Sequence, residues 1–251
     1  MNDTLDFGIK DKVAIVAGGG AIGLDIGNGR AASILLADAG VKVIVADKDE
    51  EHANNTVQMI KSRGGEALSI GGDLTKSDQC KKVVALALNN WGRLDILDNN
   101  IGIASKLSVV EETEEDWNKI MEVNLKPMFL MSKYAIPAMI NTGDGGSIVN
   151  ISSISAIDGV EGQLSYSSSK AALLGATKTM ARELGVNNIR VNCIAPSIIE
   201  TNFQTRLSSK KRLIRIIKTT PLKRIGKPDD VSNMVTFISS SKASYINGQI
   251  I

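Results

Sequence analysis

Short apolar runs alternate with longer helical stretches along most of the chain. The runs are four to six residues long, are mostly apolar with many β-branched residues, and are punctuated by Gly, Asp or Asn. Nearly continuous apolar runs of this length are typical of parallel strands that are covered on both faces. They predict strands at residues 13–16, 41–45, 67–70, 94–97, 147–151 and 189–194.

The segments between these runs are long enough for helices and carry helix boundaries. Gly40 and Gly185 follow Ala/Leu-rich stretches and are natural helix ends. The acidic turn 113–116 is typical of a helix start, and this helix is expected to reach about residue 139, with Pro127 and Pro137 as candidate bends. The pattern predicts helices at residues 29–39, 49–63, 113–139 and 166–184.

Alternation of strands and helices implies right-handed βαβ units and a parallel sheet. The sequence contains no repeat, low-complexity tract or linker that would divide it. We therefore expect an α/β fold, with one doubly wound, Rossmann-type domain over residues 1–251. Its parallel sheet should have about seven strands flanked by helices.

Composition narrows the function classes only slightly. Of the 251 residues, 43% are hydrophobic and 22% charged, with a formal net charge of +2, so nucleic acid or an anionic membrane is not an expected partner. No secretory signal or apolar run of membrane-spanning length is present, and a cytoplasmic protein is expected. Cys80 and Cys193 are expected to be reduced and structural, and His52, without metal-ligand companions, to be an exposed helix residue.

A glycine-rich stretch, residues 17–30, separates the first predicted strand from the first helix. Glycines at this place let the backbone approach a diphosphate, and the helix N-terminus offers free N–H groups to the anion. A glycine-rich loop alone is a weak signal, but its position between a strand and an Ala-rich helix suits a dinucleotide. The candidate contacts are Gly18, Gly27, Asn28 and Gly29.

An acidic residue follows at the position where such a unit binds ribose. Asp47 ends the second predicted strand, 18 residues after Gly29. Its carboxylate can accept hydrogen bonds from the adenosine ribose hydroxyls and would repel a 2′-phosphate, which favours NAD over NADP. Lys48 partly offsets that repulsion, and a helix cap is the alternative role for Asp47.

Candidate acid–base residues lie in the second half of the chain. Tyr166 and Lys170 are four residues apart at the start of a predicted helix and so share one face. A nearby ammonium favours the phenolate, so the Tyr166 pKa is expected to be lowered towards the range that a general acid or base needs. Ser153 follows a predicted strand at the end where ligands bind in parallel sheets, and its hydroxyl can donate to a substrate carbonyl.

Taken in order, these motifs resemble the short-chain dehydrogenase/reductase family over nearly the whole chain. Ser153 precedes Tyr166 by 13 residues, which is similar to the family's spacing between catalytic serine and tyrosine, and Ser152 is the less favoured choice. The other matching segments are Asn99–Gly102, Val123–Leu125, Asp73–Leu74, Tyr166–Lys170 and Pro196–Thr201.

The resemblance implies a role for each matching residue. Tyr166 would exchange the substrate proton, Ser153 would orient the substrate oxygen, Lys170 would bind the nicotinamide ribose and Asn124 would help hold a water relay. It also adds contacts to the cofactor, with Asp73 and Leu74 near the adenine and the segment that carries Ile199 and Thr201 at the carboxamide. Asn100 completes the expected cofactor-binding set.

Three features depart from the family's pattern. The loop before the first helix is five residues too long, so we expect residues 22–26 to bulge outward and Asp25 to point to solvent. Ser197 replaces a glycine, which restricts the backbone. The sequence stops at Ile251, where the family normally continues into a tail that often contributes to the subunit interface, so a truncated chain is one interpretation.

The segment around 200–225 would be a mobile lid over the substrate in this family. It carries cations uninterrupted by acids, which would attract an anionic substrate; a solvated amphipathic helix is the favoured alternative. These cations are Arg206, Lys210, Lys211, Arg212, Arg215, Lys218, Lys223 and Arg224.

The predicted function is NAD-dependent interconversion of a small-molecule secondary alcohol and its ketone, in a homo-oligomer, dimer or tetramer, with a homotetramer common in the family. Two alternatives remain open: an NADPH-dependent 3-oxoacyl (acyl carrier) reductase, and a catalytically silent nucleotide-sensing protein.

Overall fold

The computed structural model describes residues 7–104, 106–201 and 210–251, with the side chains of 210–213 left out. Across these residues six strands form one parallel sheet in the order β3-β2-β1-β4-β5-β6. The strands are β1 (Val13–Ala17), β2 (Lys42–Asp47), β3 (Ala67–Gly71), β4 (Ile96–Asn99), β5 (Gly146–Ile151) and β6 (Ile189–Ile194).

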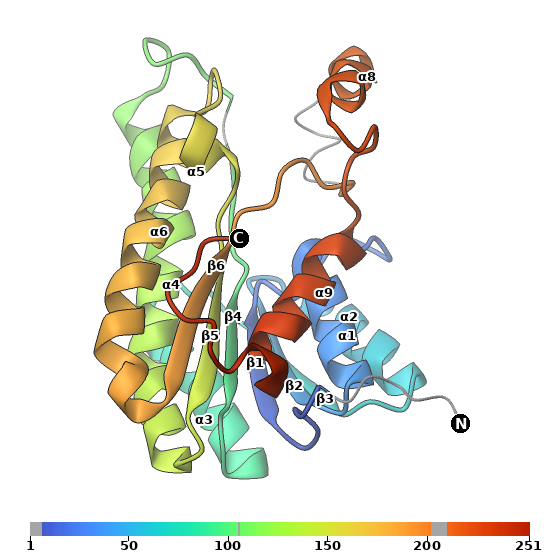
Figure 1. The fold of residues 1–251 in the computed structure, drawn as a ribbon, viewed down its shortest axis with the longest axis vertical. Coiled ribbons are helices and arrows are strands. Elements are labelled where there is room, and N and C mark those ends of the chain that lie inside the picture. Colours follow the sequence, from blue (N-terminus) through green and yellow to red (C-terminus); the bar gives the residue numbers. More distant parts are fainter. Residues whose placement is uncertain (1–6, 105, 202–209) are drawn as a thin grey trace.

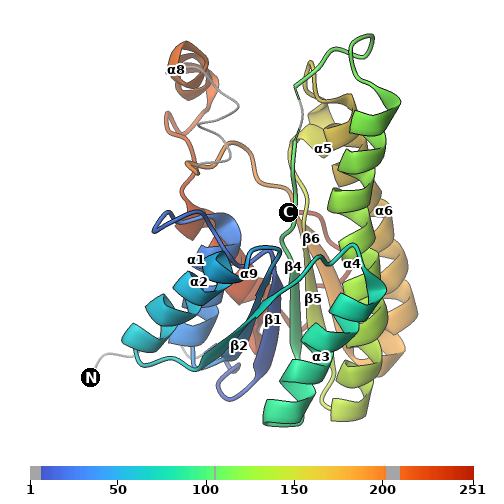
Figure 2. The same cartoon turned by 180° about the vertical axis from the view of Figure 1, so that it is seen from behind.

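Helices cover both faces of the sheet (Figure 1). On one face lie α1 (Asn28–Asp38), α2 (Glu50–Ser62) and α9 (Pro228–Ser239), and on the other lie α3 (Ser77–Trp91), α4 (Glu114–Thr142) and α6 (Leu164–Leu184). The short helix α5 (Ser155–Asp158) precedes α6, and α8 (Lys210–Thr219) stands clear of the layers in both views (Figure 2).

The doubly wound α/β fold is confirmed, but the strand count of about seven is too high by one for the described residues. The place beside β6 is taken by the last three residues, which pair with it without forming a full strand. The Cys193 amide donates to the Gln249 carbonyl, and the Ile251 amide donates to the Cys193 carbonyl. Both prolines of the fourth helix lie inside α4, which extends to Thr142.

Alternate strand residues supply two hydrophobic cores. Ala14 and Val16 of β1 face the core with α1 and α9, whereas Val13, Ile15 and Ala17 face the core with α3 and α4. Burial of side chains on both faces stabilises the sheet by about 25 cal/mol per Å² of apolar surface.

Cys80 and Cys193 are free and buried in the structure, and burial raises the pKa of each thiol to about 11. None of the helices in the described parts combines the length and apolar character needed to cross a bilayer.

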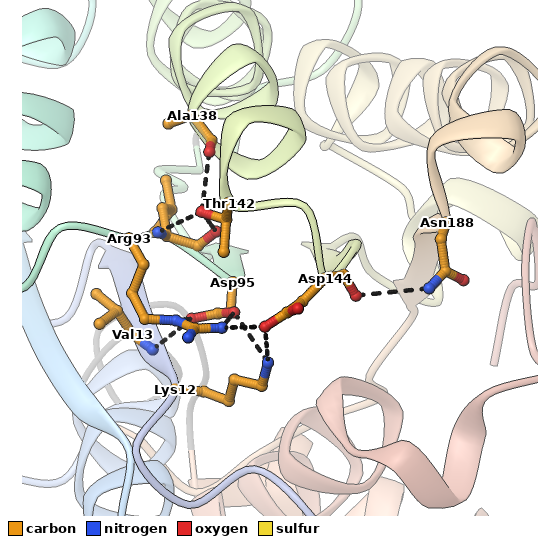
Figure 3. Close-up of polar contacts among 9 residues, drawn as sticks. Lys12, Val13, Arg93, Asp95, Ala138, Thr142, Asp144 and Asn188 are labelled. Carbon is orange, nitrogen blue, oxygen red and sulfur yellow. Dashed lines mark hydrogen bonds and ion pairs between the residues drawn. The ribbon is translucent and has the colours of Figure 1, made fainter.

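An ionic network fastens the N-terminal ends of the strands (Figure 3). Asp95, which is 5% exposed, accepts hydrogen bonds from the Val13 amide and from the Arg93 guanidinium at 2.6–2.9 Å. Arg93 and Lys12 also reach Asp144, at 2.7 and 3.0 Å, in the turn before β5. These contacts join the amino ends of β1, β4 and β5. Where the structure describes them, the loops at the carboxyl ends of the strands take no part in this network.

Asp98 is an acidic residue inside the apolar strand β4. Its side chain is 0% exposed; one carboxylate oxygen accepts from Asn100 Nδ2 at 3.1 Å, and the other has no partner. Burial raises the pKa of Asp98 from 3.8 to about 7, although the Asn100 hydrogen bond acts to lower it.

This buried carboxyl predicts a pH-dependent stability. Between pH 3.8 and about 7 the folded chain keeps a proton on Asp98 that the unfolded chain has lost, so the free energy of unfolding falls as pH rises. The difference amounts to roughly 4 kcal/mol. Asp98→Asn is expected to remove this slope in urea unfolding measured from pH 4.5 to 8, whereas equal slopes for the two proteins would contradict it.

Candidate active site

A cleft of about 1080 Å³ opens at the carboxyl ends of the central strands. The neighbours β1 and β4 lie where the strand order reverses, and ligands of doubly wound sheets bind at such a point. Eleven of the expected site residues line it: Gly18, Gly27, Asn28, Gly29, Asp47, Asn100, Ser153, Tyr166, Lys170, Ile199 and Thr201.

The glycines bring the start of α1 close to the end of β1. A Cβ on Gly29 would overlap the carbonyl oxygen of Gly18, and Gly18 itself has φ +87°. Gly27 occupies the N-cap position, where no side chain accepts a hydrogen bond from the first turn, and the first turn holds no acidic residue. The uncapped N–H groups and the partial positive charge of the helix end therefore suit an anion in the cleft.

The longer loop bulges outward, as expected. Leu24 is 79% exposed, and Ile22 and Ile26 are 43% and 39% exposed. Asp25 is exposed, as expected, but it also borders the cleft.

Asp47 ties the end of β2 to this loop. One carboxylate oxygen accepts from the Gly20 amide at 3.0 Å and the other from the Asp49 amide at 3.1 Å. The expected alternative, capping of the next helix, falls to Asp49, which accepts from the amides of Glu51 and His52. Asp47 thus stays at the cleft wall, where its remaining lone pairs are available to a ligand.

Lys170 is buried at the base of the cleft, 3% exposed. Its ammonium donates to the carbonyls of Ile151, at the end of β5, and Ile101, beyond β4, at 2.8 and 3.1 Å. Burial lowers the Lys170 pKa to about 8. A Cβ on Gly102 would lie 3.0 Å from the ammonium, so glycine at that position keeps the loop against it.

Tyr166 is 9% exposed and lies in the first turn of α6. Burial raises the pKa of its phenol, and a side-chain hydrogen bond with Ser153 acts in the opposite direction. The sequence predicted that Lys170 would lower the pKa of Tyr166, and this prediction is wrong. Desolvation of the phenolate raises the pKa by more than the Ser153 hydrogen bond lowers it. Ser152 instead donates to the Lys170 main-chain carbonyl at 2.8 Å.

Asn124 lies behind the cleft wall, 2% exposed, in α4. Its Oδ1 accepts from the Ile103 amide at 2.8 Å, and its Nδ2 donates to the Ile103 carbonyl and to Ser169 Oγ at 2.9 and 3.0 Å. This side chain fastens the loop after β4 to both α4 and α6. Both amide donors are used inside the protein.

Comparison with known proteins matches residues 23–251 to a family model described as enoyl-(acyl carrier protein) reductase. The 3-oxoacyl-(acyl-carrier-protein) reductase of Thermotoga maritima is 37% identical over 243 residues, 97% of this chain and 96% of that protein. Human dehydrogenase/reductase SDR family member 4 is 36% identical, over 97% of this chain and 86% of that protein. The chain belongs to the short-chain dehydrogenase/reductase family.

A solved relative agrees over the full length. A 7α-hydroxysteroid dehydrogenase, complexed with NADH and 7-oxo glycochenodeoxycholic acid, superposes with a TM-score of 0.93 at 33% identity. The match covers 100% of this chain and 96% of that one. This protein is accordingly an oxidoreductase of a family that binds a nicotinamide cofactor.

The cleft fits such a cofactor. Besides the uncapped start of α1, the Oδ1 atom of Asn28 is buried without a partner. Ser197, which replaces the family's glycine, is not among the non-glycine residues with positive φ, so the substitution introduces no backbone strain of that kind. Among the described residues, no group of three or more His, Cys, Asp or Glu could hold a metal ion.

Some expectations about the site are modified by the structure. Asp73 and Leu74 are not among the residues that line the cleft, so their contact with adenine stays a prediction; Asp73 accepts two hydrogen bonds from Thr75, and Leu74 is 3% exposed. Although burial acts to raise the Asp73 pKa, the Thr75 hydrogen bonds and two nearby lysines bring it below its usual value. His52, expected to be exposed, is partly buried and borders the cleft, which no local sequence signal indicated.

Proposed function

We propose that the protein is an NAD-dependent oxidoreductase that interconverts a secondary alcohol and its ketone. The observation that carries the proposal is the presence of Ser153, Tyr166 and Lys170 in one cleft with the anion-binding start of α1. A protein that only senses the nucleotide would have no need for a buried phenol and ammonium beside it.

Each side chain has a distinct task. Tyr166 Oη gives a proton to the carbonyl oxygen of the ketone or takes one from the hydroxyl of the alcohol. Ser153, hydrogen-bonded to Tyr166, orients that oxygen, and Lys170 holds ribose hydroxyls of the cofactor. When bound, the nicotinamide supplies or accepts the hydride. Asn124 acts through the loop that it fastens and is proposed to support the proton relay from there.

The raised pKa of Tyr166 sets the pH dependence of the two directions. A phenol that stays protonated at neutral pH is a competent general acid for ketone reduction. Oxidation needs the phenolate, so its rate should increase as pH rises through the alkaline range.

Replacement of Tyr166 tests this assignment. Tyr166→Phe keeps the ring and removes the proton, so turnover is expected to fall by about 10²- to 10⁴-fold in both directions. NADH binding, followed by nicotinamide fluorescence, should be retained. Tyr245, which is fully exposed, provides the matched control Tyr245→Phe, expected to keep wild-type turnover. Substantial turnover by Tyr166→Phe would mean that another group transfers the proton.

The preference for NAD rests on Asp47. Its carboxylate lies at the cleft wall at the end of β2, where it is proposed to accept from the adenosine ribose and to repel a 2′-phosphate. The solved hydroxysteroid dehydrogenase that resembles this chain was complexed with NADH, which supports the same choice. Lys48, also at the cleft, partly offsets the repulsion.

Substitution of Asp47 is expected to relax this selectivity. Asp47→Asn should raise the Kd for NADH by roughly 10-fold, because a charge-assisted hydrogen bond is weakened, and should lower the Kd for NADPH. Lys48→Ala should weaken NADPH binding and leave NADH nearly unchanged. Both constants come from fluorescence titrations. Tighter binding of NADPH than NADH by the wild-type protein would refute the NAD assignment.

A second candidate is an NADPH-dependent 3-oxoacyl (acyl carrier) reductase. Its support is the reductase of Thermotoga maritima and a second cavity of about 930 Å³ beside α6, whose lining includes two cations, Lys106 and Arg215, against one acid, Glu161. Such cations suit an anionic substrate. Arg215 belongs to α8, in the segment around 200–225 that we propose as the substrate lid; Arg206 lies outside the described residues.

We further propose a homo-oligomer that pairs α4 and α6 across its interface. Phe129 and Ile140 of α4 and Leu164 of α6 are 56%, 41% and 44% exposed, and such a pairing would cover apolar side chains of these helices. The size of the assembly, dimer or tetramer, follows from sedimentation of the purified chain.

A further inference from the structure

Arg30, the third residue of α1, is 0% exposed and is the largest fully buried side chain in the described part of the chain. A guanidinium has five N–H donors, and five hydrogen bonds are formed. They lead from Nε to Thr56 Oγ1 (2.9 Å), from Nη1 to the carbonyls of Gly23 (2.8 Å) and Asp25 (2.6 Å), and from Nη2 to those of Ala21 (2.8 Å) and His52 (3.3 Å).

Three of these acceptors give the long loop its shape. The carbonyls of residues 21, 23 and 25 all turn towards one guanidinium. Ala21, Ile22 and Asp25 also line the cleft, so the wall formed by the longer loop is folded around Arg30. The extra residues of this loop are thus held in place by one side chain.

Thr56 extends the same contacts to the beginning of the loop. Its hydroxyl, fully buried in α2, accepts from Arg30 Nε and donates to the Gly19 carbonyl at 2.9 Å. Arg30 thus connects α1 and α2 to the loop that leads from β1 into α1.

Without a bound ligand, the buried positive charge of Arg30 destabilises the folded state. Its five acceptors are neutral oxygens, while the carboxylates of Asp25 and Asp47 attract it through space. Burial of a cation has an effective penalty of several kcal/mol, and the first turn of a helix already carries partial positive charge. The Arg30 guanidinium and the helix start repel each other because both are positive. A diphosphate bound at the start of α1 would bring negative charge close to both groups and so would make the electrostatic energy favourable.

We propose that Arg30 is a positioning residue for the dinucleotide. It folds residues 21–25 into the wall of the diphosphate site and places positive charge behind the start of α1. The proposal rests on the family's nicotinamide cofactor and is independent of the substrate and of Tyr166 chemistry.

The test compares two ligands in calorimetric titrations. ADP-ribose carries the diphosphate, and adenosine does not. Arg30→Lys keeps the charge but cannot supply five donors in a plane, so its Kd for ADP-ribose is expected to rise at least about 10-fold. The Kd for adenosine should change less than about 2-fold. Arg30→Met, which also removes the charge, should bind ADP-ribose still more weakly.

Arg190 provides the matched control. This largely buried arginine on β6 donates to the carbonyls of Ile238, Ile246 and Ser240, away from the cleft. Arg190→Lys should lower the melting temperature and leave both affinities unchanged. If Arg30→Lys, folded by its melting curve, binds ADP-ribose within 2-fold of wild type, or loses both ligands equally, the proposal is overturned. This holds whether or not Arg30→Met folds.

Discussion

The parallel pairing of β1 with β4 is the constraint on which the site depends. This pairing places β1 and β4 side by side. The loops that follow these two strands run in opposite directions, so a cleft opens at their carboxyl ends. The Asn100 amide donates to the Ala17 carbonyl at 2.9 Å, which continues this pairing to the edge of the cleft. Above it, Gly18 meets the loop after β4: a Cβ there would lie 3.1 Å from the backbone of Asn100 and Ile101, and its φ of +87° disfavours any other residue.

Burial determines the chemistry of the groups placed there. Lys170 and Tyr166 are both removed from water, and their pKa values move in opposite directions, down for the ammonium and up for the phenol. Each shift disfavours the charged form, so in the cleft the Lys170 ammonium releases its proton more readily, and the Tyr166 phenol less readily, than in water. The two carbonyls that bind the Lys170 ammonium fix its position, and Asn124 secures the loop that provides one of them.

Most of the fold could be predicted from the sequence because a parallel sheet leaves a strong local signal. Apolar runs identified all six strands, and the glycine loop and Asp47 followed from their place beside them. What could not be predicted depends on distant contacts: five acceptors converge on Arg30 from two segments, and the net pKa of Tyr166 depends on burial. The strand count was wrong because the last residues pair with β6 only briefly.

A crystal structure of the complex with NADH would test the central claim most directly, namely that the start of α1, Asp47 and Lys170 together hold one dinucleotide. We expect the diphosphate at the uncapped first turn of α1, the adenosine ribose on the Asp47 carboxylate and the nicotinamide ribose on the Lys170 ammonium. A diphosphate bound elsewhere, or an adenosine ribose without contact to Asp47, would contradict it.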